Sequence, residues 1–187
     1  TFANQDLEGY EYDTEKAKAL LEEAGYPDGF DITIWTNENQ QRMDIAEVLQ
    51  NQLKEVGINA SAEVMEWGTY LTNTAAGEHD MFILGWTTVT GDADYGLYAL
   101  FHSSQFGDAG NRTFYKNEDV DRLLDEARTS VDPAEREAKY KEVQEIITAD
   151  APWIFTWTGE DLTGAVNGIE GFQLHPAGHY RLKDVTY

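Results

Sequence analysis

The segment FDITIWTNENQQRMDIAEVLQNQLKEVGINASAEV, residues 30–64, decides the fold. Its first part, residues 30–36, alternates apolar and polar side chains and is rich in β-forming residues, which predicts a strand. Apolar side chains recur at helical spacing through residues 42–56, and Gly57 can supply a left-handed helix end. Residues 58–64 alternate again and predict a second strand. Two strands joined by a helix form a crossover connection, which is typical of parallel strands in an α/β fold.

Further helices are expected around this unit, because capping residues such as Asp13 and Asp132 precede apolar positions at helical spacing. They are predicted at residues 14–24, 67–76, 95–101, 117–127 and 133–147. The last two are expected to pack as a helical hairpin. A short, fully apolar third strand is predicted at residues 81–84. The expected architecture is one domain with a mainly parallel sheet and flanking helices.

The C-terminal region is expected to contain a β-hairpin followed by loops. Residues 153–157 and 162–166 have strand-like composition, and residues 158–161 predict the turn between them. The tail, residues 169–187, is rich in Gly and Pro, which predicts loops. We interpret this tail as a segment that returns toward a neighbouring domain.

The stretch LGWTTVTGDADYGLYALF, residues 84–101, is the most informative for function. Its apolar start ends in Trp86, and small polar residues with two acids, Asp92 and Asp94, follow. Open α/β sheets bind ligands at the carboxyl ends of their strands, so this loop predicts one wall of a binding crevice. Trp86 fits either a core position or a ligand-contacting surface, and the acids fit either helix caps or ligand contacts.

Composition restricts the partners. The 187 residues include 35 acidic and 13 basic side chains, a formal net charge of -22, so nucleic acid and anionic membranes are repelled. The chain has no cysteine, which excludes disulfides and cysteine-ligated metals. It has no apolar run of membrane-spanning length, no signal sequence and no initiator Met, and we interpret it as an excised fragment.

The sequence supports no catalytic or metal chemistry. None of its serines lies in a G-x-S-x-G elbow. His175 and His179 are four residues apart, but Pro and Gly between them exclude a helical zinc motif. A calcium loop starting at Asp92 fails because Leu97 and Ser103 stand where it needs Gly and an acid. We therefore expect a protein that is not an enzyme and has no cofactor.

Four stretches together resemble the C-terminal lobe of the dipeptide- and oligopeptide-binding proteins of ABC importers, the extracellular solute-binding protein family 5. They are EYDTEKAKALLEEAGYPDGFDITIWT, LKEVGINASAEVMEWGTYL, GEHDMFILGWTTVTGDADYGLYALF and DPAEREAKYKEVQEIITADAPWIF. The resemblance implies a periplasmic-binding-protein-like II lobe, with residues 1–187 as a single C-terminal fragment of a longer, two-lobed protein. It also implies an extracytoplasmic location, periplasmic or as a cell-surface lipoprotein, with a lipid anchor or signal outside this fragment.

The resemblance also implies which residues bind ligand. In these peptide binders an Asp three residues after the Trp of the G-W motif pairs with the peptide ammonium, and here that position is Val89. The ammonium must then meet Asp92, Asp94, a main-chain carbonyl or the missing lobe, or the ligand differs. The sequence GWTTVTGDADY resembles the glutathione- and oligopeptide-binding members of the family more than it resembles the strict dipeptide binder. The candidate ligand-binding residues are the main-chain groups of Trp86, Thr87, Thr88 and Val89, with Asp92, Asp94, Asn37, Asn39 and Arg42.

The expected function is therefore a solute-binding component that holds peptides between two lobes for import through ABC permease subunits. On the same scaffold the ligand could instead be glutathione, a nickel chelate or an oligosaccharide. A sensory or interaction module without transport is the alternative from another class. Arg42 fits either a ligand carboxylate or the exposed start of a helix.

Overall fold

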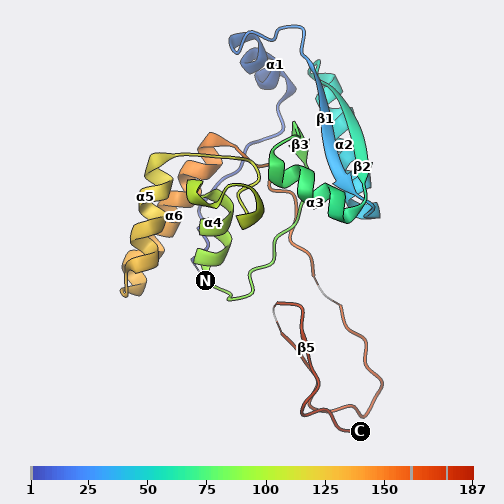
Figure 1. Ribbon diagram of the computed structural model, residues 1–187, viewed down its shortest axis with the longest axis vertical. Helices are drawn as coiled ribbons and strands as arrows, with labels where there is room; N and C mark the ends of the chain where they lie inside the picture. Colours follow the sequence, from blue (N-terminus) through green and yellow to red (C-terminus); the bar gives the residue numbers. More distant parts are fainter. Residues whose placement is uncertain (1, 161, 176) are drawn as a thin grey trace. The chain divides into compact units, whose positions relative to one another are not determined.

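The computed structural model describes residues 2–160, 162–175 and 177–187. These residues form two compact units, and Figure 1 labels most of their helices and strands. The sheet unit consists of residues 6–85 and 100–116. The helical unit consists of the N-terminal residues as far as Gln5, residues 86–99 and residues 117–187. No described helix combines the length and apolar composition that a membrane crossing requires.

The predicted crossover unit forms the centre of the sheet unit. Strand β1 (Asp31–Asn37), helix α2 (Gln40–Glu55) and strand β2 (Asn59–Met65) follow one another along the chain. β1 pairs in parallel with β2 along its whole length, and the sheet has the order β2-β1-β3. The expectation of an α/β fold with a parallel sheet is confirmed.

The core of the sheet unit lies between α2 and the sheet. Ile34, Ala46 and Ile83 are buried, and partly buried apolar residues pack around them: Ile45, Leu49, Leu53, Ala60 and Met81. Helix α1 (Thr14–Glu23) begins as predicted, since the Asp13 side chain accepts a hydrogen bond from the Lys16 amide. It buries none of its own residues among those described.

Strand β3 is shorter than predicted, because it ends at Phe82 rather than Leu84. It comprises Met81–Phe82 and pairs in parallel with β1. The Ile83 amide still donates to the Trp35 carbonyl at 2.9 Å. The Ile83 carbonyl instead accepts the Tyr70 hydroxyl at 2.7 Å, so the side chain of helix α3 (Trp67–Ala76) terminates the ladder.

The chain continues from β3 through a loop into helix α4 (Ala93–Phe101) and two 3-10 turns, η1 (Ser103–Gln105) and η2 (Gly107–Ala109). In the helical unit, α5 (Glu118–Thr129) and α6 (Pro133–Asp150) lie side by side as the predicted hairpin (Figure 1). Asn117 and Asp132 cap them. Their contact buries apolar side chains and one tyrosine: Val120, Leu123, Leu124, Ala127, Tyr140, Val143 and Ile147.

The predicted hairpin at residues 153–166 is wrong. The described residues of this stretch form no strand, and Asp161 of the predicted turn lies outside them. Phe155 is 61% exposed and Leu162 is 92% exposed, so these apolar side chains are not buried against another part of the described chain. Without such burial, a two-stranded ribbon is marginal in water.

The tail is more ordered than the predicted loops. Strands β4 (Gln173–Leu174) and β5 (Tyr180–Arg181) pair antiparallel, and Glu170 forms a bridge with Thr186. The ring of Phe172 lies beside that of Tyr180, with 6.0 Å between the two centroids.

Candidate functional site

Three of the predicted ligand-binding residues form one local network at the carboxyl end of β1. Arg42 Nη1 donates to Asn37 Oδ1 at 2.8 Å, and Asn39 Oδ1 caps α2 by accepting from the Arg42 amide at 3.0 Å. The Arg42 guanidinium also lies over the ring of Trp67, 5.8 Å from its centroid. Its Nη2 is 3.5 Å from where a Cβ on Gly85 would stand. We call Asn37, Asn39, Arg42 and Trp67 the carboxyl-edge cluster.

Arg42 differs from the other half-buried arginines that the structure describes. Arg136 pairs with Asp92 at 2.7 Å, and Arg112 Nη2 lies 3.8 Å from Asp108 Oδ1. Arg42 pairs with no carboxylate of a described residue, in a chain that has 35 acidic residues. A half-buried guanidinium with remaining donors can bind a carboxylate through two parallel hydrogen bonds.

Tyr70, which holds the end of β3, lies close to this cluster, with 5.9 Å between its ring centroid and that of Trp67. Burial raises the pKa of the Tyr70 phenol well above its usual value, although the positive charges of Arg42 and Arg112 oppose that shift. The neutral hydroxyl donates to the Ile83 carbonyl. This contact fixes the point from which the chain leaves the sheet toward Gly85.

The loop of residues 86–92, which we call the tryptophan loop, belongs to the helical unit. Trp86 is 38% exposed, so it is not a core residue of the described chain, and its ring stacks on Tyr95 with 5.3 Å between centroids. Thr88 Cγ2 lies 3.3 Å from where a Cβ on Gly96 would stand. Thr87 and Val89 are exposed.

The backbone of the tryptophan loop is open for hydrogen bonding. The N–H and C=O groups of residues 86–89 make no hydrogen bond to any other described residue. Each peptide unit has one donor and one acceptor that need a partner when they are buried. An extended ligand could satisfy them by strand-like pairing, as the sequence predicts.

Both acids that follow the loop face arginines of the hairpin. Asp92 Oδ1 accepts from Arg136 Nη2 at 2.7 Å and from the Asp94 amide at 2.9 Å, so Asp92 caps α4. Asp94 Oδ1 lies 3.5 Å from Arg128 Nε. Burial raises the pKa of Asp92, but the hydrogen bonds from Arg136 and the Asp94 amide outweigh it and hold that pKa below its usual value.

The nine predicted site residues thus lie in two groups. Asn37, Asn39 and Arg42 belong to the sheet unit, and residues 86–89 with Asp92 and Asp94 belong to the helical unit. The structure adds four partners that the sequence did not indicate: Trp67, Tyr95, Arg128 and Arg136. Each of the four lies too far along the sequence from the site residue that it contacts for a local sequence pattern to predict the contact. Direct ligand contact by the nine stays a prediction.

Comparison with known proteins defines the class. A model of the bacterial extracellular solute-binding proteins, family 5 Middle, matches residues 1–108, which are more than half of the chain. The chain belongs to this family of solute-binding proteins. The predicted resemblance to the family and the predicted fold class are therefore confirmed.

Individual relatives are binding proteins. The glutathione-binding protein GsiB of Shigella dysenteriae is 34% identical over 96% of this chain and 36% of its own length. The periplasmic binding protein DppA of Helicobacter pylori, in complex with the peptide STSA, is 41% identical over 81% of this chain and 30% of its own, with a TM-score of 0.75. A dipeptide-binding protein of Pseudoalteromonas sp. SM9913, in complex with Met-Leu, is 27% identical over 92% of this chain and 35% of its own, with a TM-score of 0.76. The chain thus spans about a third of the length of these relatives.

Proposed function

We propose that this chain is the C-terminal lobe of the solute-binding component of an ABC importer and supplies one wall of a peptide-binding cleft. The observation that carries the proposal is the row of open peptide groups at residues 86–89, next to the exposed ring of Trp86. Pairing with a ligand's backbone gives affinity without demanding particular side chains. The flat indole adds contact area at little entropic cost.

Charge restricts the ligand in each of the two groups of candidate residues, taken separately. Asp92 and Asp94 each have an arginine partner, and Val89 has no charge. A peptide ammonium is therefore held by main-chain carbonyls or by the other lobe. Arg42, which has no carboxylate partner among the described residues, is the group that binds a ligand carboxylate, with Asn37 orienting it.

Glutathione is the second candidate ligand. It is a small peptide with two carboxylates, and a relative that matches 96% of this chain carries the name of glutathione-binding protein. The carboxyl-edge cluster, whose arginine pairs with no carboxylate of a described residue, suits such an anionic peptide better than a cationic one.

The proposed partners follow from the same function. Closure of the two lobes around the ligand would present a distinct shape to ABC permease subunits. The strongly acidic chain has no role in binding nucleic acid. We place the protein outside the cytoplasm, and propose that residues 169–187 return toward the other lobe. The proposal includes no catalytic step.

Calorimetric titration of the full-length protein tests this function. The ligands are tri-alanine, glutathione and, as a non-peptide of similar size, maltotriose. Saturable binding of tri-alanine or glutathione, with no binding of maltotriose, is the expected result. Binding of maltotriose alone would overturn the proposal.

A further inference from the structure

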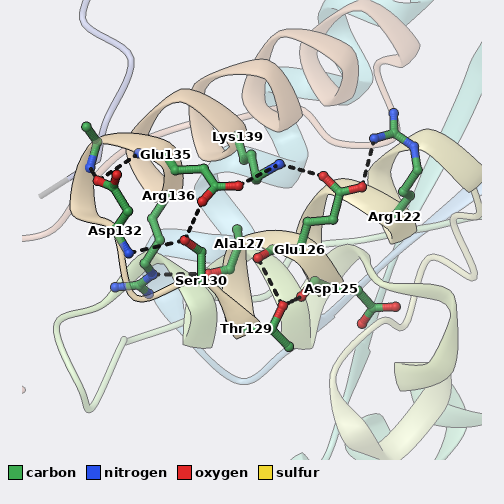
Figure 2. A network of polar contacts seen from close by, with 11 residues as sticks. Arg122, Asp125, Glu126, Ala127, Thr129, Ser130, Asp132, Glu135, Arg136 and Lys139 are labelled. Carbon is green, nitrogen blue, oxygen red and sulfur yellow. Dashed lines mark hydrogen bonds and ion pairs between the residues drawn. The ribbon is translucent and has the colours of Figure 1, made fainter.

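The Arg136 side chain connects the tryptophan loop to the helical hairpin. Its Nη2 donates to Asp92 Oδ1 at 2.7 Å and to the Tyr140 hydroxyl at 3.2 Å, and its Nε donates to the Ala127 carbonyl at 3.1 Å. Its guanidinium also lies over the ring of Phe2, 5.2 Å from the centroid. Figure 2 shows Arg136 reaching from α6 toward Ala127 of α5. Contacts on several sides fix the direction of the guanidinium.

Asp92, the partner of Arg136, is where the tryptophan loop joins α4. Its amide donates to Thr90 Oγ1 at 3.3 Å, and its carboxylate caps the helix through the Asp94 amide. One turn further, Tyr95 stacks on Trp86. The loop thus folds back on the start of α4, and Arg136 attaches that start to the hairpin.

The hairpin does not depend on this contact for its own cohesion. Apolar side chains fill the space between α5 and α6, and Lys139 binds both Glu126 and Glu135 on the side shown in Figure 2. The contact between Arg136 and Asp92 therefore stabilises the loop rather than the hairpin.

A second arginine makes a parallel but more exposed contact. Arg128 pairs with Asp94 at 3.5 Å and lies over the ring of Tyr98, 4.1 Å from its centroid. The Arg128 side chain is 51% exposed, whereas that of Arg136 is 22% exposed. Since solvent weakens exposed ion pairs, Arg136 is the stronger of the two attachments.

We propose that Arg136 is a positioning residue for ligand binding: through Asp92 it holds the tryptophan loop so that the peptide groups of residues 86–89 and the ring of Trp86 stay presented to the ligand. The identity of the ligand in this inference rests on the proposed function, whereas the ordering of the loop by Arg136 is independent of that function. A loop that is already ordered loses less conformational entropy when the ligand binds, so binding is tighter.

The first test measures the mobility of the loop without ligand. This chain has no cysteine, so Val89→Cys carries a single nitroxide label on an exposed position of the loop. Electron paramagnetic resonance of the full-length protein should show a more mobile label after Arg136→Met or Asp92→Asn. Arg122→Met is the matched control, because Arg122 pairs with Asp119 and Glu126 on α5 and with no described residue of the loop. An unchanged label in Asp92→Asn, which keeps the other contacts of Arg136, would overturn the proposal even if Arg136→Met fails to fold.

The second test measures affinity for tri-alanine and glutathione in the protein without the label. Arg136→Met and Asp92→Asn should each weaken binding about tenfold, because the first removes a charge-assisted hydrogen bond and the second removes the negative charge that strengthens it. The double variant should be no weaker than either single one, and Arg136→Lys should recover part of the loss. Weaker binding with an unchanged label would overturn the positioning role. If the wild type binds neither ligand, the proposed function fails, and the label still decides whether Arg136 orders the loop.

Discussion

Arg42 is the residue on which the charge preference of the proposed site depends. Its guanidinium has a hydrogen bond to Asn37 and an aromatic neighbour, but no carboxylate among the described residues. Arg42→Met should weaken binding of tri-alanine by about 10- to 100-fold, since a hydrogen bond to a charged group contributes roughly 1.5–3 kcal/mol. Isothermal titration calorimetry measures this, with the exposed Arg181→Met as the control.

Tri-alanine amide tests whether Arg42 binds the ligand carboxylate or affects ligand binding in general. Tri-alanine amide lacks the carboxylate, so Arg42→Met should leave its affinity nearly unchanged. An equal loss for the acid and the amide would show that Arg42 does not bind the carboxylate.

His79 gives the sheet unit a pH dependence. Its ring lies 6.0 Å from that of Trp35 and 4.4 Å from that of Phe82, and burial lowers its pKa although Asp80 opposes the shift. The unfolded chain therefore binds the proton more readily, so stability falls as the pH drops from about 6.5 through the lowered pKa. His79→Gln should reduce this loss of stability.

Urea unfolding between pH 7.5 and 5 measures the effect of His79. The exposed His179→Gln serves as the control. The same pH slope in His79→Gln and in the wild type would contradict the role given to His79.

At the scale of elements, the close approach of two turns positions β1 against β2. A Cβ on Gly29, whose φ is +73°, would lie 1.9 Å from the Gly57 carbonyl oxygen. Gly25 has a similar φ, +89°, but nothing lies within 4 Å of its Cβ position. Gly29→Ala should therefore lower the free energy of unfolding by about 1–3 kcal/mol more than Gly25→Ala does, the usual cost of overpacking. Equal values in urea denaturation would contradict the close approach.

Local signals predicted most elements well. Asp13 and Asp132 cap helices as the sequence predicts, and the alternation of residues 30–36 produces a strand. The same kind of alternation failed at residues 153–166, because a pattern does not report whether a surface exists to cover its apolar side. The early end of β3 depends on the hydroxyl of Tyr70, thirteen residues before Ile83, which no local pattern shows.

At the scale of the whole chain, the sequence predicts which residues are candidates for ligand contact, which stays a prediction, but not how their charges are paired. The residues at the carboxyl end of β1 and in the tryptophan loop follow from strand order and the resemblance to solute-binding proteins. That Asp92 is paired depends on Arg136, 44 residues later in the chain. That Arg42 has no carboxylate partner depends on how the other acids of the described residues are placed.

The ligand that the full-length protein carries is the most direct test of the central claim, that this chain forms one wall of a peptide-binding cleft. The protein is purified without denaturation, its mass is measured by native mass spectrometry, and released small molecules are identified by tandem mass spectrometry. The account predicts added mass that is released as short peptides or glutathione. Release of only sugars or metal chelates from the purified protein would contradict it.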